Sequence, residues 1–296
     1  MKTQVIGDIV IDRIVEAEGA FADFGFILPG ATQDLVDANA DWLTPRFVAP
    51  DGKLIMAFHA LVLRTPRQTI LVDCCVGNDK DRPLRPMWHR QQTPFLDTMR
   101  AAGVAPEDID IVMCTHLHAD HVGWNTQLVD GRWVPTFPNA RYVFARREYE
   151  FWEAETRRAK AEGAEEPPNH GSFDDSVLPV MEAGRAVLVE ADHELDHGIW
   201  LEPAVGHTPG NVNVNVKDGG RHALLCGDTM HTPLQLCDPG LSSAFCEDPA
   251  VSARSRTAMV ERLADTDSVL LAGHFPTPVA GRIVRHREAF RLDTGR

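Results

Sequence analysis

Short runs of apolar residues that end in polar side chains recur along the chain and predict buried β-strands. Four of these runs are TILVDC (69–74), IDIVMCT (109–115), HALLCGD (222–228) and SVLLAGH (268–274). Continuous apolar runs of this length are typical of strands that are covered on both faces of a sheet. NVNVNV (211–216) instead alternates strictly, so its valines face one side of a strand and its asparagines face the other.

Helices are predicted between these strands. Pro94 is expected to begin a helix that runs through Met99 and ends at Gly103. After the strand RYVFA (141–145), a highly charged stretch predicts a helix that faces solvent, and another helix is expected at about 250–265. Strands mixed with helices in this way predict an α+β protein.

The chain is expected to form a single domain over residues 1–296. An N-terminal arm at about 1–53 and an inserted helical excursion at about 146–185 would extend it. Residues 20–50 show no clear periodicity and are unusually apolar, so they are expected to cover the core, to contribute to a substrate pocket, or to form a contact between two copies. The candidate pocket residues of this arm are Phe24, Phe26 and Trp42.

Charge and cysteine content narrow the function classes. The 296 residues include 29 Lys and Arg against 43 Asp and Glu, which gives a net charge of −14 and argues against a nucleic-acid or anionic membrane partner. The start of the chain lacks the unbroken apolar segment of a secretory signal. None of the six cysteines forms a CxxC pair, so we expect a reduced, cytoplasmic protein. The expected binding partner is a small-molecule substrate.

The segment His116-Leu117-His118-Ala119-Asp120-His121 concentrates potential metal ligands. Four ligand-type side chains within six residues exceed what one tetrahedral ion with an open position needs from a single segment. His116 and His118 would share a face if the preceding strand continued through them.

Three more candidate ligands follow predicted strands. They are His207 in GHTPG, Asp228 in GD and His274 in AGH, and a glycine precedes each of them. Taken singly, each is more typical of a hydrogen-bonded surface residue. Taken together with the first segment, they predict a metal site on the rim of a rigid sheet.

These motifs and their order resemble the metallo-β-lactamase-fold hydrolase superfamily over roughly residues 55–285. The resemblance implies an αββα sandwich of two mixed sheets flanked by helices. It also implies two divalent ions, one on His116, His118 and His207 and the other on Asp120, His121 and His274, with Asp228 between them. Asp73 matches the family's early Asp, which orients a ligand rather than binding metal. Imidazole-rich ligand sets favour Zn²⁺ but also suit Fe, Co, Ni or Mn.

Such a centre predicts hydrolysis of a small ester-type substrate by a hydroxide held between the ions, with Asp120 a catalytic ligand. The arm, THLHADHVGWN and AGHFPTPVAGRI resemble the branch of lactonases and organophosphate hydrolases such as methyl parathion hydrolase. The substrate would be a lactone, a carboxyl ester or a phosphotriester. Thioester or β-lactam hydrolysis and an iron-dependent oxidoreductase are the alternatives that the same motifs leave open.

Two further residues are candidates at this site. His231 stands three residues after Asp228, where the lactonases carry a Tyr, and it could donate a hydrogen bond to a substrate oxygen or protonate a leaving group. The alternative is a surface His on a loop. Trp124 could line the substrate pocket or simply pack in the core.

Overall fold

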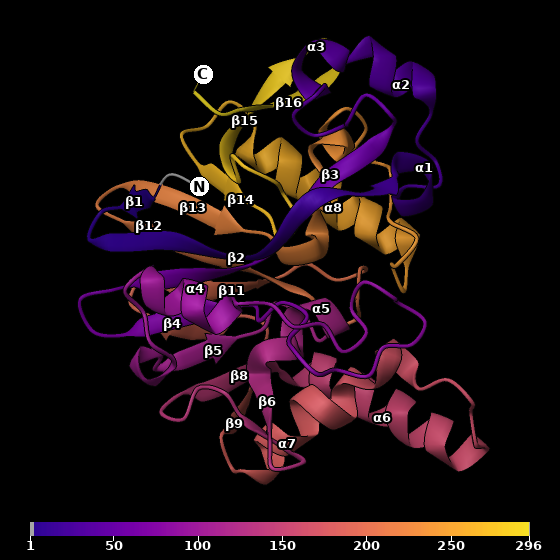
Figure 1. The fold of residues 1–296 in the computed structure, drawn as a ribbon. Coiled ribbons are helices and arrows are strands. Elements are labelled where there is room, and N and C mark those ends of the chain that lie inside the picture. Colours follow the sequence, from indigo (N-terminus) through magenta and orange to yellow (C-terminus); the bar gives the residue numbers. More distant parts are fainter. Residues whose placement is uncertain (1–2, 296) are drawn as a thin grey trace. The chain divides into compact units, whose positions relative to one another are not determined.

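The computed structural model describes residues 3–295 and contains two large mixed sheets (Figure 1). Both sheets have seven strands, and a separate pair of strands forms a small hairpin. Contacts between residues divide the chain into two compact units, which are described separately below. Unit 1 comprises Met1–Asp8, Ala17–Ala57 and Ala191–Arg296, and unit 2 comprises Ile9–Glu16 and Phe58–Glu190.

The first sheet has the strand order β1-β2-β3-β4-β5-β8-β9. Its strands are β1 (Gln4–Ile6), β2 (Ile9–Asp23), β3 (Lys53–Arg64), β4 (Thr69–Val72), β5 (Ile111–Met113), β8 (Arg141–Ala145) and β9 (Ala186–Val189). The hairpin strands are β6 (Thr126–Val129) and β7 (Arg132–Pro135). In unit 2, β4, β5, β8 and β9 run parallel, with Val112 paired to Leu71 on one side and to Tyr142 on the other.

The second sheet belongs to unit 1 and has the order β10-β11-β12-β13-β14-β15-β16. Its strands are β10 (Glu194–Asp196), β11 (Ile199–Pro203), β12 (Val212–Asp218), β13 (Arg221–Leu225), β14 (Val269–Leu271), β15 (Ala280–His286) and β16 (Ala289–Asp293). Only the β13–β14 pair is parallel among the pairings described for this sheet, with Leu224 opposite Leu270. The apolar residues Val269–Leu271 and Ala223–Leu225 that pair here are those whose continuous runs predicted buried strands.

The helices largely follow the sequence signals. Pro94 precedes α4, which ends where Ala102 and Gly103 turn the chain. The helices are α1 (Phe24–Ile27), α2 (Gln33–Ala38), α3 (Ala40–Leu43), α4 (Phe95–Ala101), α5 (Ala119–Val122), α6 (Arg146–Glu162), α7 (Leu178–Glu182) and α8 (Pro249–Leu263). Short 3₁₀ turns lie at Pro106–Asp108, Gly123–Asn125, Pro168–Gly171, Gly227–Thr229 and Pro233–Leu236, and a π-helical turn lies at Phe173–Val177.

The charged helix α6 has one buried face, which the expectation of a solvated helix missed. Glu148, Tyr149, Trp152 and Thr156 are buried along it, at the spacing of one helical stripe. Tyr149 and Trp152 join the apolar core of unit 2 together with Phe144 of β8. The helix therefore packs on its own unit, and Figure 1 shows it beside the segment that follows it.

The N-terminal arm is more regular than its sequence pattern predicted. Most of residues 20–50 lie in the end of β2 and in the three short helices α1, α2 and α3. Leu28 and Leu43 are fully buried, so much of the arm's apolar content packs within the protein. Short helices of four to six residues carry no measurable 3.6-residue periodicity, which is why the pattern predicted an irregular segment.

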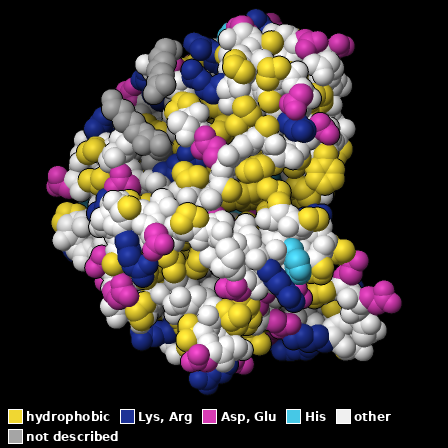
Figure 2. Space-filling view, in the orientation of Figure 1, with side chains coloured by type: hydrophobic (Ala, Val, Ile, Leu, Met, Phe, Trp, Pro, Cys, Tyr) yellow, Lys and Arg dark blue, Asp and Glu magenta, His cyan; other side chains and the backbone are white. Residues whose placement is uncertain are grey.

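The predicted single domain remains a prediction, and residues 1, 2 and 296 of that range lie outside the described residues. Among residues 3–295, no helix has both the length and the apolar character needed to cross a membrane. Acidic and basic side chains are interspersed over the face of the molecule that Figure 2 shows.

Candidate metal centre

Four candidate ligands of unit 2 follow a strand end. β5 ends at Met113, and the chain then runs through His116 and His118 to α5, whose first turn carries Asp120 and His121. The strand does not continue through His116 and His118, so the condition under which they would share a strand face is not met. β4 and β5 are parallel, so Asp73, directly after β4, lies at the same edge of the sheet.

Asp73 links this loop to the end of β4. Its Oδ1 accepts the backbone N–H of Thr115 at 2.8 Å, and the Thr115 hydroxyl lies 3.1 and 3.0 Å from its two carboxylate oxygens. Its Oδ2 lies 3.0 Å from Nδ1 of His121. The Asp73 backbone has a φ of 59°, a left-handed conformation that short polar side chains tolerate better than most.

These contacts define which ring nitrogens are left to bind a metal. A carboxylate only accepts hydrogen bonds, so His121 donates through Nδ1–H and its Nε2 carries the lone pair. The Thr115 hydroxyl donates to Asp73, so its oxygen accepts from Nδ1 of His116 at 3.2 Å. Metal-binding histidines usually donate their second ring nitrogen in this way, which leaves Nε2 for the ion.

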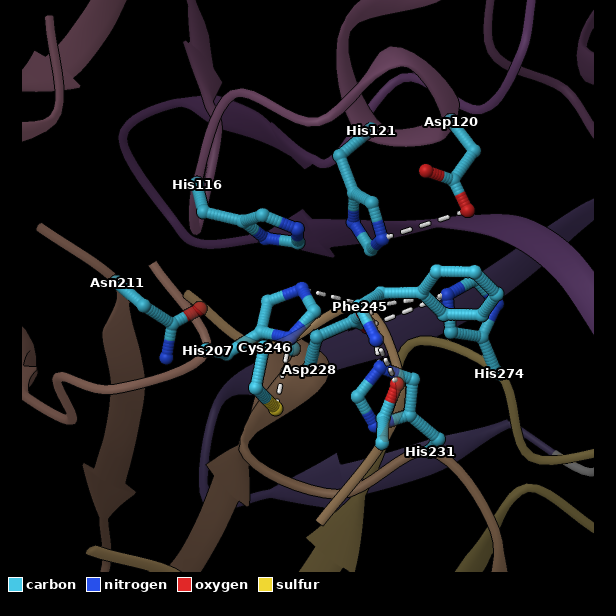
Figure 3. A network of polar contacts seen from close by, with 12 residues as sticks. His116, Asp120, His121, His207, Asn211, Asp228, His231, Phe245, Cys246 and His274 are labelled. Atoms are coloured by element: carbon cyan, nitrogen blue, oxygen red, sulfur yellow. Dashed lines mark hydrogen bonds and ion pairs between the residues drawn. The ribbon is translucent and has the colours of Figure 1, made fainter. Parts of the chain in front are cut away.

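The candidate ligands of unit 2 lie close together. The His116 ring is 4.7 Å from that of His118 and 4.1 Å from that of His121. Nε2 of His121 is 4.0 Å from Oδ2 of Asp120, a contact drawn in Figure 3. Ligand atoms within 4.8 Å of one another are found both for His116 with His118 and for Asp120 with His121. Unit 2 thus offers two adjacent pairs of ligands.

Unit 1 places three more candidates at the ends of its strands. Asp228 follows β13 and His274 follows β14, and these strands are parallel, so their ends meet at one edge. His207 lies in the loop after β11, next to Gly206. Gly206 has a φ of 124°, and a Cβ at this position would lie 2.1 Å from the backbone nitrogen of Ser252 in α8. The loop can therefore approach the helix this closely only with glycine.

Three imidazoles of unit 1 surround the Asp228 carboxylate (Figure 3). Nε2 of His207 lies 3.3 Å from Oδ2, Nε2 of His231 lies 3.1 Å from Oδ2, and Nε2 of His274 lies 3.2 Å from Oδ1. All four side chains are buried, each at most 4% exposed. His231 is therefore not a surface residue, and that alternative is wrong.

In His274 and His207, the ring nitrogen that does not face Asp228, Nδ1, has a partner of its own. Nδ1 of His274 lies 3.0 Å from the carbonyl oxygen of Ala57, which can only accept a hydrogen bond. Nδ1 of His207 lies 3.6 Å from Sγ of Cys246. Burial raises the pKa of the Cys246 thiol, which keeps it protonated at neutral pH. Its S–H is directed to Ser252, so the sulfur accepts from His207.

This donor set fits a metal ion. With Nδ1–H of His274 and of His207 bound elsewhere, the Nε2 lone pairs face carboxylate oxygens at 3.2–3.3 Å. Two lone pairs at that distance repel unless a cation, either a proton or a metal ion, lies between or beside them. Buried imidazoles and carboxylates with fixed outer nitrogens are the set that Zn²⁺ and related ions bind.

The remaining predicted site residues occupy varied positions. Trp124 is buried in the core of unit 2, stacked on Phe95 at 5.5 Å, and its indole donates to Glu16. Phe26 is 58% exposed and contacts the Phe245 ring edge-on at 6.1 Å, while Phe24 is half-buried. Trp42 packs against Phe47 at 6.1 Å.

Of the residues that orient the ligands, the sequence resemblance pointed to Asp73 but sequence reasoning missed the others. Thr115 and Cys246 act through single contacts with His116 and His207, and no motif marks Cys246. Thr115 directly precedes the ligand segment, so its position was a usable signal. Glu148 is buried although its helix is highly charged. Tyr149 and Trp152 are spaced as on one helical face, and this spacing indicates that the neighbouring Glu148 is buried as well.

Comparison with known proteins decides the family. A family model described as the metallo-beta-lactamase superfamily matches residues 59–274. The chain belongs to this superfamily. The predicted family and its fold of two mixed sheets flanked by helices are therefore confirmed.

Curated proteins that resemble the chain include lactonases. An N-acyl homoserine lactonase from Bacillus sp is 25% identical over 127 residues, which cover 43% of this chain and 40% of the relative. N-acyl homoserine lactonase AiiA from Bacillus thuringiensis subsp. kurstaki is 22% identical over 185 residues, 62% of this chain and 63% of the relative. The matched regions thus span less than two thirds of these relatives.

Solved structures share the fold along nearly the whole chain. The hydrolase AbOPH superposes with a TM-score of 0.79 at 19% identity, covering 98% of this chain and 96% of that one. The dizinc quorum-quenching lactonase AidC, solved with the product N-hexanoyl-L-homoserine, has a TM-score of 0.73 at 18% identity over 98% of this chain and 96% of its own.

Proposed function

We propose that this superfamily member is a dinuclear metal-dependent hydrolase of a small ester-type substrate. The observation that carries the proposal is the ring-nitrogen arrangement. His116, His121, His207 and His274 each have Nδ1 bound to an acceptor of the protein, which leaves Nε2 for an ion. A core histidine without a ligand role has no need of this shared orientation.

The family pattern assigns these residues to two ions. One ion would be bound by His116, His118 and His207, the other by Asp120, His121 and His274, and Asp228 would contact both. When bound, divalent ions would supply a hydroxide near neutral pH and polarise a carbonyl or phosphoryl oxygen of the substrate. Zn²⁺ is our first choice for both positions because imidazole suits it.

The protein's own side chains would hold the centre in one arrangement. Asp73 orients His121 directly and His116 through Thr115, and the Ala57 carbonyl and Cys246 orient His274 and His207. These partners hold the Nδ1–H of each ring, so the lone pair of the neutral ring is on Nε2. The histidines can then bind a metal ion at neutral pH without rearranging.

His231 is the candidate for a proton-handling residue. Its ring lies 4.8 Å from that of His207 and 5.9 Å from that of His274, and its Nδ1 is buried without a hydrogen-bond partner among the described residues. The Asp228 carboxylate only accepts hydrogen bonds, so Nε2 of His231 donates to it and Nδ1 of the neutral ring is an acceptor. Nδ1 could take up a proton, and the protonated ring would donate it to a substrate oxygen or to a leaving group. The sequence-based role of His231 therefore remains part of the proposal.

The substrate class rests on the relatives. Lactones are the first class to test because the matching curated relatives are N-acyl homoserine lactonases. Carboxyl esters and phosphotriesters are tested beside them because the sequence motifs predict an ester-type substrate without distinguishing the three classes. His231 at the position of the lactonase Tyr favours a substrate other than their own. A homodimer contact, a substrate role for the arm and a cytoplasmic location belong to the proposal as well.

A substrate panel tests this function. Metal-replete protein is incubated with p-nitrophenyl esters, lactones and phosphotriesters, beside chelator-treated protein and a His116→Ala variant. Hydrolysis of at least one class that is lost in both controls supports the proposal. Oxygen consumption by iron-loaded protein without any hydrolysis would support the oxidoreductase instead.

A further inference from the structure

The turn at Pro168–Gly171 in unit 2 contacts the loop that carries His118. Nδ2 of Asn169 donates to the carbonyl oxygen of Leu117 at 2.6 Å, and Oδ1 of Asn169 accepts from the backbone N–H of Ala119 at 2.9 Å. One side-chain amide therefore binds the peptide groups on both sides of His118. His118 is the residue that precedes the first turn of α5, where helix N–H groups lack partners within the helix.

The backbone of this turn adopts a conformation that is unfavourable for most residues. Asn169 has a φ of 49° and His170 a φ of 55°, and Gly171 follows with a φ of 80°. The left-handed region is strained for a residue other than glycine, and asparagine tolerates it best. Such a turn persists only where its surroundings hold it.

Buried charged side chains hold the turn. Arg82 is 1% exposed, donates to the carbonyl oxygen of His170 at 2.9 Å, and forms two hydrogen bonds with Asp175 at 2.6 and 2.9 Å. Lys80 is fully buried and donates to the carbonyl oxygen of Asp175 at 3.2 Å. The backbone next to Asn169 is thus bonded directly to a buried arginine.

A second side chain binds the same loop from helix α6. Oε1 of Glu148 accepts the backbone N–H of Leu117 at 3.0 Å and the indole N–H of Trp152 at 2.7 Å. The Trp152 ring lies 5.5 Å from the His118 ring. Both peptide groups of Leu117 are therefore bound by side chains from the 146–185 segment, and an aromatic ring contacts the imidazole itself.

From this arrangement we infer that Asn169 is a positioning residue for His118 and so for the metal ion that His118 would bind. The inference rests on the proposed function. Outer partners of metal ligands that fix ligand orientation commonly change metal affinity by about 10- to 100-fold when removed. The segment around Asn169, which had no assigned role in the sequence, would then determine how tightly the centre holds its metal.

A purely structural role for Asn169 predicts something different. The two hydrogen bonds could serve only to fasten the turn to the protein, in which case their loss would lower thermal stability and leave metal affinity unchanged. The two roles are separable because glycine adopts the left-handed conformation without strain. Asn169→Gly therefore removes the amide and leaves the turn's backbone conformation accessible.

The test compares full-length wild-type protein with Asn169→Gly, Asn169→Asp and Asn139→Gly. Asn169→Asp keeps an acceptor for Ala119 N–H but places a carboxylate oxygen against the Leu117 carbonyl. Asn139→Gly is the matched control, because Asn139 also donates to a backbone carbonyl in unit 2, that of Glu107, at 2.8 Å. Zn²⁺ affinity is measured by chelator competition, the ligand environment by Co²⁺ absorption, and metal-free stability by thermal unfolding.

We expect Asn169→Gly to weaken Zn²⁺ binding by about 10- to 100-fold and to change the Co²⁺ spectrum, while Asn139→Gly matches the wild type. Asn169→Asp should fall between them, and it carries the test if the glycine variant does not fold. Unchanged Zn²⁺ affinity and an unchanged Co²⁺ spectrum in either folded variant would overturn the inference. If wild-type protein itself bound no Zn²⁺, the proposed function would be wrong. That result differs from failure of the inference about Asn169, in which wild type and variants bind Zn²⁺ equally well.

Discussion

Replacing Asp73 with asparagine tests whether the orientation of the ring nitrogens matters for metal binding. Asp73 accepts three kinds of donor: the Thr115 backbone N–H, the Thr115 hydroxyl and Nδ1–H of His121. An amide has nearly the same shape but only one acceptor oxygen. In Asp73→Asn, an NH₂ group must therefore face either His121 or the backbone N–H of Thr115.

Both orientations of the new amide are unfavourable. If NH₂ faces His121, Nδ1 must become the acceptor, so the proton moves to Nε2 and the ring can no longer bind a metal there. If NH₂ faces Thr115, two buried N–H donors oppose each other. An unsatisfied buried donor costs about 1–3 kcal/mol. At about 1.4 kcal/mol per tenfold change, this corresponds to about 5- to 140-fold weaker metal binding.

Chelator competition with Zn²⁺ measures this effect directly. Asp110→Asn is the control, since Asp110 accepts a backbone N–H from Thr69 at 2.8 Å in the same unit but contacts no candidate ligand among the described residues. We expect Asp73→Asn to lose affinity within the calculated range while Asp110→Asn does not. Equal affinities for Asp73→Asn and wild type, with both folded, would refute the account of ring orientation.

Three further predictions follow from the same structure. Asp120→Ala should fold and should bind one ion fewer than wild type by elemental analysis. Its kcat in steady-state assays should fall by on the order of 10³-fold, because the variant lacks a proposed metal ligand beside the nucleophile. Retention of more than half of kcat would contradict this prediction. His231→Ala should lower kcat at least tenfold with metal content unchanged, since one donor to a developing oxyanion is typically worth about 10²–10³; an unchanged rate would make His231 a structural residue. Burial lowers the pKa of Lys80 from its usual 10.5 to about 7. Between pH 7 and pH 10.5 the folded state therefore binds fewer protons than the unfolded state. The free energy of unfolding of the wild type rises with pH in this range. Urea unfolding should therefore show that the stability of Lys80→Met relative to wild type falls by about 2 kcal/mol from pH 7 to pH 9. Lys53→Met, at a partly exposed lysine, is the control. A difference that stays constant with pH would contradict the lowered pKa.

Several buried strands, the longer helices and the family could be predicted from the sequence for a clear reason. Buried parallel strands such as β5 and β14 require continuous apolar runs, and these stand out in any chain. The candidate ligands are recognisable because four of them share one short segment. The matched family model over residues 59–274 includes all of the predicted ligands.

Other features depend on contacts that a linear pattern does not contain. The helices α1, α2 and α3 span four to six residues each, too few to show a periodicity. The left-handed turn at Asn169 is stabilised by Arg82, which lies 87 positions earlier in the chain and is bonded to the neighbouring His170 carbonyl. Cys246 reaches His207 across 39 positions. Distant partners of this kind appear only when the chain is folded.

The number of metal ions per chain tests the central claim most directly. Metal-free protein is reconstituted with excess Zn²⁺, passed through a desalting column and analysed for metal and protein. The seven candidate ligands, four in unit 2 and three in unit 1, predict two ions per chain. Hydrolytic activity should depend on both ions. One ion per chain, unchanged by further Zn²⁺ in fully folded protein, would contradict the dinuclear account.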